Sequence, residues 1–288
     1  EPMPVRALDL ARLRRHALSQ ALGIDREALL LEPLGFCGNG FEGVRDPRTL
    51  PTTRLHGTFA LVSLPLALRQ LITQATESAG LDLDRLVYSG QALAVACDDP
   101  EAAGRGTGES DRLLLVDIGG CSTECVLLER GHLQRSLTVP WGGMKAAEAI
   151  ALRCRITLDQ ALTLSLQGSS SAKPEVAQVW QKQRQTLAKG VQQVLEGEPL
   201  PSRALVTGRG ALVDGMVEWV QETTGIAAVL GRSPRSKSLR DIGQQLALGA
   251  AFGLLEMMEH PVPRALPRPS SLVDRLLIGT KTLLTEYF

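Results

Sequence analysis

The residues best suited to chemistry lie in one short stretch, "DIGGCST", at positions 117–123. Apolar residues precede and follow it, a pattern that predicts two buried strands joined at a hairpin tip. Glycine N–H groups and hydroxyls at such a tip can bind phosphate, and a nearby carboxylate can hold Mg²⁺ through water. We therefore predict a phosphate-binding turn, with a structural type I′ turn as the alternative. The residues expected to contribute are Asp117, Gly119, Gly120, Ser122 and Thr123.

A second glycine turn, "LVTGRGALVDG", occupies residues 205–215. A predicted strand leads into Gly208 and Gly210, and a predicted helix follows. This arrangement suits contact with a nucleoside or an α-phosphate. It lacks the lysine of a P-loop and the spacing of a dinucleotide fingerprint. Arg209, between the two glycines, could either grip a phosphate or fill the pocket.

Cysteine and histidine positions predict neither a metal centre nor a catalytic triad. The five cysteines form no CxxC pair, so we expect reduced thiols of a cytosolic protein. The four histidines are scattered and follow no Ser or Cys at nucleophile spacing.

Composition also excludes some classes of partner. Lys plus Arg equals Asp plus Glu at 31 each, and aromatic residues make up 3% of the chain. Nucleic acid is therefore not expected as a partner. The sequence has no run of about 18 apolar residues, so no transmembrane helix is predicted.

Strands and helices are predicted to alternate, which indicates an α/β fold with ligand chemistry at the turns. Residues 35–57 are rich in Gly, Pro and Asp and are predicted to be loops around short strands. The other predicted strands include 58–65, 81–90, 113–118, 123–128 and 203–207. The predicted helices include 5–22, 66–80, 144–154, 157–168, 176–197 and 241–258.

The C-terminal region predicts a linker followed by an amphipathic helix. Residues 261–270 hold four prolines, which is typical of an extended linker. The helix beyond it either docks on the body of the protein or lies in a membrane interface. Its apolar stripe comprises Leu272, Val273, Leu276, Leu277, Leu283, Leu284, Tyr287 and Phe288.

In the order of these features the chain resembles the actin-like ATPase superfamily, and within it the FtsA family of bacterial cell-division proteins. "DIGGCSTE" resembles the second phosphate motif of that superfamily, and "LVTGRGALVDG" resembles its adenosine motif. The resemblance implies α/β actin-like (ribonuclease H-like) lobes with a small α+β insert domain. It implies an insert domain over 1–88, an actin-like core over 89–258 with a reduced sublobe near 151–188, a proline-rich linker over 259–270 and the amphipathic helix over 271–288.

The function implied by this resemblance is a nucleotide-binding scaffold that tethers a cell-division polymer to the inner face of the cell membrane. The implied cofactors are ATP and Mg²⁺, with Asp117 near the metal. The implied partners are a tubulin-like division protein or other cell-division proteins, further copies of the chain through the insert domain, and the membrane surface through the C-terminal helix. The implied nucleotide contacts are Asp117, Gly119, Gly120, Cys121, Ser122, Thr123, Gly208, Arg209 and Gly210.

The chain departs from the family pattern in ways that argue for at most weak ATPase activity. It begins at Glu1 without the family's first phosphate hairpin, so we expect a fragment or a processed product. Cys121 replaces the third glycine of the phosphate motif, and Arg209 replaces a small residue. Leu162 and Ser165 stand near the positions where relatives offer Glu and Lys to the nucleoside.

Two other functions remain open. A PilM-like component of type IV pilus or secretion machinery would share the insert domain and bind a peptide of an inner-membrane protein, without needing a lipid-binding tail. "DIGGCSTE" also resembles the exopolyphosphatase and pppGpp phosphohydrolase family. That family places a carboxylate in the helix matching "SGQALAVA", where this chain has Gln91, Ala92 and Leu93 and so lacks a base.

Overall fold

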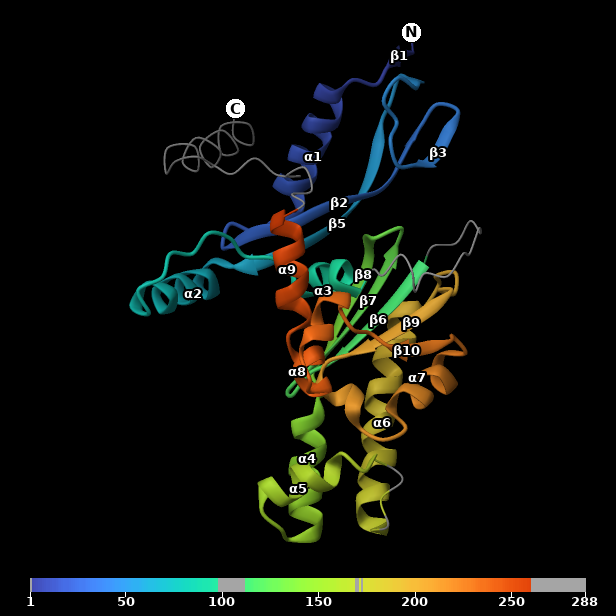
Figure 1. Cartoon of the computed structure of the whole chain (residues 1–288). Helices are drawn as coiled ribbons and strands as arrows, with labels where there is room; N and C mark the ends of the chain where they lie inside the picture. Colours follow the sequence, from blue (N-terminus) through green and yellow to red (C-terminus); the bar gives the residue numbers. More distant parts are fainter. Residues whose placement is uncertain (1, 98–111, 169–170, 172, 260–288) are drawn as a thin grey trace. The chain divides into compact units, whose positions relative to one another are not determined.

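The computed structural model describes residues 2–97, 112–168, 171 and 173–259, and these form two compact units that divide between Tyr88 and Ser89 (Figure 1). The predicted amphipathic helix and nearly all of the predicted linker lie outside the described residues. Within the described ranges, each helix is too short or too polar to cross a bilayer.

The first unit is built on a three-stranded antiparallel sheet in the order β3-β2-β5. The long strands β2 and β5 pair from Arg26 opposite Pro65 to Cys37 opposite His56. The short strands β1 and β4 form a separate antiparallel pair. The elements are β1 (Met3–Pro4), α1 (Ala7–Ala21), β2 (Arg26–Gly38), β3 (Phe41–Val44), β4 (Pro51–Thr52), β5 (His56–Pro65) and α2 (Leu66–Ser78).

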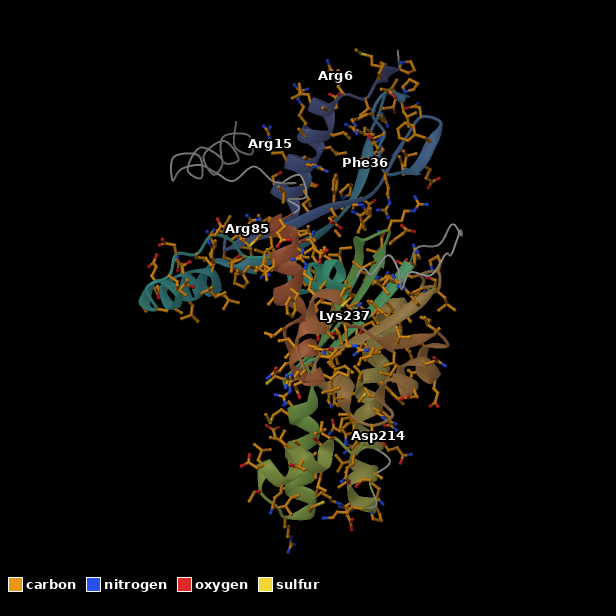
Figure 2. All side chains as sticks on the ribbon, viewed as in Figure 1. Arg6, Arg15, Phe36, Arg85, Asp214 and Lys237 are labelled. Atoms are coloured by element: carbon orange, nitrogen blue, oxygen red, sulfur yellow. The ribbon has the colours of Figure 1, made fainter. Side chains whose placement is uncertain are left out.

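α1 packs against this sheet beside an aromatic pair formed by β2 and β5. Phe36, labelled in Figure 2, meets Phe59 edge to face with ring centroids 5.8 Å apart. Gly57 lies beside them, and a Cβ atom there would come within 2.9 Å of Leu13 Cδ2 on α1. The absence of a side chain at Gly57 therefore lets α1 approach β5 closely.

The second unit contains a five-stranded sheet in the order β10-β9-β6-β7-β8. β6, β7 and β8 form an antiparallel meander, whereas β9 and β10 run parallel to β6. The predicted α/β architecture is thus confirmed. The strands are β6 (Arg112–Ile118), β7 (Thr123–Glu129), β8 (His132–Val139), β9 (Arg203–Thr207) and β10 (Ala228–Leu230).

Helices cover both faces of this sheet. Because side chains alternate along β6, Leu114, Val116 and Ile118 enter a core shared with α4 to α7, which includes Trp180. On the opposite face α3 contacts β7 and crosses α9. The helices are α3 (Ser89–Cys97), α4 (Gly143–Cys154), α5 (Leu158–Ser165), α6 (Pro174–Leu195), η2 (Arg209–Leu212), α7 (Met216–Thr224), η3 (Pro234–Ser238), α8 (Ile242–Ala247) and α9 (Gly249–Glu259).

Three predicted elements differ from the structure. The strand predicted over 81–90 is wrong, because residues 81–88 form no regular element and α3 begins at Ser89. Residues 35–38, predicted to be in a loop region, belong instead to the 13-residue strand β2. The helix predicted over 241–258 is two helices, since Leu248 leaves the helical conformation at φ −95° and ψ 4°.

Candidate functional site

The predicted phosphate hairpin forms, and its tip is open. β6 and β7 pair as far as Ile118 opposite Thr123, which leaves a four-residue loop. The Gly119 N–H closes this loop by donating to the Ser122 carbonyl at 3.0 Å. Residues 119–122 all have φ outside the positive region, whereas a type I′ turn needs positive φ at both central residues. The structural type I′ alternative is therefore wrong.

The start of α4 fixes the orientation of the peptide groups at this tip. Gly143 N–H donates to the Gly119 carbonyl at 3.0 Å, and Met144 N–H donates to the Gly120 carbonyl at 2.8 Å. Because a trans peptide points its N–H away from its C=O, the N–H groups of Gly120 and Cys121 are directed away from α4. A Cβ atom at Gly142 would lie 2.5 Å from the Gly120 carbonyl oxygen, so this close approach needs glycine.

The second glycine turn packs directly against the first. Parallel pairing of β6 with β9 places Asp117 opposite Thr207, and Gly208 follows at once. A Cβ atom at Gly208 would lie 2.4 Å from Asp117 Oδ1, and its φ of +76° also favours glycine. A Cβ atom at Gly210 would lie 2.2 Å from Ile118 Cγ2. The structure thus brings together the two turns that the sequence indicated.

Asp117 lies beside a second carboxylate that the sequence analysis did not single out. Glu124 is opposite Asp117 in the β6–β7 pairing, and Ser89 Oγ donates to Glu124 Oε2 at 2.8 Å. Burial, and then the negative charge of Glu124, raise the pKa of Asp117 to about 6. A cation between the two carboxylates would offset both effects. The sequence could have identified Glu124 from the register of the hairpin. A four-residue loop after Ile118 places Glu124 opposite Asp117.

The hydroxyls near the tip have different surroundings. Thr123 is buried, and its hydroxyl donates to the Trp141 carbonyl at 2.9 Å, which ties β7 to the chain entering α4. Cys121 and Ser122 are exposed at the tip. Thr207 Oγ1 is buried and has no hydrogen-bond partner among the described residues. The hydroxyl that is free for a ligand at the tip is therefore that of Ser122.

The sequence predicted Mg²⁺ near Asp117, and the structure adds Glu124 as a second carboxylate beside it. Within the described part of the chain, no group of three or more His, Cys, Asp or Glu side chains could hold a metal ion. Carboxylate oxygens do suit Mg²⁺, which usually takes one or two carboxylates and keeps several waters. The pair formed by Asp117 and Glu124 therefore fits the donor set for Mg²⁺.

Leu162 and Ser165, the two residues expected near a nucleoside, have their contacts within the protein. Leu162 packs against the core, and Ser165 is buried with its hydroxyl donating to the Leu162 carbonyl at 2.7 Å. Trp180 Nε1 also donates to the Ser165 carbonyl, at 3.1 Å. Both the hydroxyl and the carbonyl of Ser165 are therefore used in hydrogen bonds within the protein.

The two segments expected to border the nucleoside are joined to each other. Asp214, labelled in Figure 2, donates its N–H to the Leu166 carbonyl at 2.9 Å. Gly168 has a φ of +56°, and a Cβ atom there would lie 2.4 Å from the Asp214 carbonyl oxygen. Arg209 is exposed and extends towards Gly243 at the start of α8. The hairpin tip thus suits a phosphate group, whereas the Ser165 hydroxyl is used within the protein and Leu162 offers no polar group.

Sequence comparison gives relatives of one kind. No family model matches the chain. FtsA of Pseudomonas aeruginosa is 22% identical over 281 residues, which cover 87% of this chain and 66% of that protein. FtsA of Bacillus subtilis is 24% identical over 167 residues, covering 56% of this chain and 35% of that protein. The chain thus spans less than two thirds of the length of these relatives.

Structural comparison gives actin-like neighbours. The PilM-PilN type IV pilus biogenesis complex matches with a TM-score of 0.61 and 18% identity, covering 91% of this chain and 76% of the other. MreB5 of Spiroplasma citri bound to ADP matches with a TM-score of 0.55 and 14% identity, covering 69% of this chain and 67% of the other. The chain therefore has the actin-like ATPase fold, and its sequence resembles the FtsA cell-division proteins.

Proposed function

We propose that this chain is an actin-like scaffold of the FtsA type, which links a cell-division complex to the inner face of the cell membrane. The observation that carries the proposal is the sequence similarity to FtsA over 87% of the chain. The presence of a small α+β unit, residues 2–88, together with an actin-like core supports it. The partners would be a tubulin-like division protein or other division proteins, and further copies of the chain bound through the first unit.

The scaffold role does not depend on an enzymatic step. The start of α3 carries Gln91, Ala92 and Leu93, and Ser89 there donates a hydrogen bond to Glu124. No carboxylate on α3 is available to activate water, which argues against an exopolyphosphatase or a pppGpp phosphohydrolase. ATP and Mg²⁺ stay predictions from the resemblance, and the proposal assigns no chemical step to either.

Membrane attachment is proposed for the C-terminal amphipathic helix. We expect the chain to sediment with vesicles of phosphatidylethanolamine and phosphatidylglycerol. Leu276→Glu combined with Phe288→Glu should weaken binding by about tenfold or more, because both changes place a charge on the apolar stripe. The measurement is the fraction of protein that sediments as lipid concentration increases.

A matched control separates this effect from a general effect of surface charge. Leu152 on α4 is 84% exposed, so Leu152→Glu should sediment like the unaltered chain. Equal sedimentation of the unaltered chain and the double variant would contradict attachment through this helix.

The PilM-like function is the second candidate, favoured by the structural match to the PilM-PilN complex over 91% of the chain. On that account the chain alone would not bind vesicles. It would bind only when the vesicles display a short cytoplasmic peptide of an inner-membrane protein. Vesicle binding by the chain alone, lost in the double variant, therefore favours the FtsA-like function.

A further inference from the structure

α9 carries an exposed apolar stripe on the side opposite its contact with α3. Leu248 precedes the helix, and Ala251, Leu255 and Met258 follow at intervals of three or four residues, which places them on one face. The three large side chains are 44%, 49% and 51% exposed, and Ala251 is exposed as well. Gly253 packs against α3, and Leu255 lies about 200° further round the helix. We call these four apolar residues the α9 stripe.

The charged and small residues of α9 lie towards the rest of the second unit. Arg235 of η3 donates to the two carboxylate oxygens of Glu259 at 3.1 and 2.6 Å, and it lies 4.0 Å from Glu256. Gly249 and Gly253 are buried where α9 crosses α3. A surface helix normally turns its charged residues to water and its large apolar residues to the core. Because α9 leaves large apolar residues in water, its stripe is suited to be covered by a further apolar segment.

The next part of the chain has the properties of such a cover. Residues 260–270 separate the end of α9 from the predicted amphipathic helix over 271–288, which has an apolar stripe of its own. An extended linker of this length spans about 30 Å. The 11 residues of α9 span only about 16 Å, so the terminal helix can fold back along it. The short linker also keeps the local concentration of that helix in the millimolar range, where even a weak contact forms.

We propose that the C-terminal helix docks on the α9 stripe when the chain is away from a membrane. The inference rests on the amphipathic helix of the proposed function, and it adds the surface that covers the apolar face of this helix in water. The two helices would form an αα-hairpin. The same apolar side chains, Leu276 and Phe288 among them, would face either α9 or lipid. Docking therefore competes with membrane attachment.

Hydrogen exchange of the full chain without vesicles, measured by mass spectrometry, tests the docking. Most of the stability of a protein helix comes from packing of its apolar face, so an undocked terminal helix would exchange nearly as fast as an unfolded peptide. We expect residues 271–288 to exchange at least about tenfold more slowly than an unfolded peptide. Leu255→Glu should remove this protection, because it places a charge in the middle of the α9 stripe.

Leu152→Glu is the matched control. It makes the same substitution at an exposed leucine on α4, and it should leave the protection of 271–288 unchanged. Exchange of β6 and β7 should be the same in both variants as in the unaltered chain, which shows that the variants are folded. Equal exchange of 271–288 in the unaltered chain and in Leu255→Glu would overturn the proposal.

Other covers of the stripe predict different results. A second copy of the chain would make the protection increase with protein concentration, and such an increase would overturn the proposal. If the stripe itself bound lipid, Leu255→Glu would weaken vesicle binding. We expect it instead to strengthen vesicle binding by about threefold or more, because the terminal helix is released.

Failure of the docking can be told from failure of the proposed function. If the unaltered chain binds vesicles and Leu255→Glu binds them equally or less well, the docking is wrong and membrane attachment stands. If neither binds vesicles but 271–288 is protected only in the unaltered chain, membrane attachment is wrong and the docking stands.

Discussion

Replacing Asp117 with Asn should stabilise the chain at neutral pH by about 2 to 3 kcal/mol. Burial and the charge of Glu124 raise the pKa of Asp117 to about 6, above its unfolded value of about 3.9. Near pH 7.5 the carboxyl is ionised in both states, and the folded state bears the full cost of burying the charge. The asparagine side chain would avoid this cost because its amide is neutral and similar in shape to the carboxyl group.

The pH dependence fixes the sign of this effect. Between about pH 4 and pH 6 the folded state binds a proton that the unfolded state does not, so stability falls as pH rises through this range. The gain from Asp117→Asn should thus be complete above about pH 7 and disappear near pH 4. The gain is the difference in the free energy of unfolding between Asp117→Asn and the unaltered chain, measured in urea with EDTA at pH 4 and at pH 7.5.

Glu124→Gln provides the matched control for this prediction. It removes the repulsion but not the burial, so its gain at neutral pH should be smaller than that of Asp117→Asn. A gain of the same size at pH 4 and at pH 7.5 would show that the stabilisation does not come from the ionisation of Asp117.

Gly253→Ala should destabilise the chain by about 3 kcal/mol or more. α9 crosses α3 so closely that a Cβ atom at Gly253 would lie 1.7 Å from the Ala92 carbonyl oxygen and 3.1 Å from Ala96 Cβ. Ala is the better helix former by about 1 kcal/mol, so a loss of stability can come only from the forced separation of the two helices. The free energy of unfolding in urea is the quantity to compare.

Gly249→Ala is the control on the same helix. A Cβ atom there would meet Leu93 Cδ2 at 3.0 Å, and the end of a leucine side chain can move where a backbone carbonyl cannot. We expect its effect to lie within about 1 kcal/mol of zero. If Gly253→Ala proved as stable as Gly249→Ala, the close crossing of α3 and α9 would be wrong.

Much of the candidate site could be predicted because it depends on local pattern. Two apolar blocks around "DIGGCST" specify a hairpin, and parallel pairing of its first strand with the strand before Gly208 brings the two turns together. The role of Thr123 could not be predicted, because its acceptor is the Trp141 carbonyl, 18 residues away. The contact of Asp214 with Leu166 could not be predicted for the same reason, since it depends on the tertiary fold.

The fold was predicted less well where tertiary pairing overrides local composition. Gly and Pro residues made 35–57 resemble loops, yet β2 continues to Gly38 because β5 offers it a partner, with shifts in register before Leu30 and Gly35. Residues 81–88 have the composition of a strand but are not a strand, since pairing with a neighbour is what forms one.

The measurement that tests the scaffold most directly is recruitment of a polymer to vesicles. Labelled polymers of the tubulin-like division protein from the same organism would be mixed with vesicles, and the vesicles floated through a density gradient. We predict that the polymers float with the vesicles only when the unaltered chain is present, and that they stay behind with the Leu276→Glu and Phe288→Glu double variant. Floating of the chain without the polymers would contradict an FtsA-like tether.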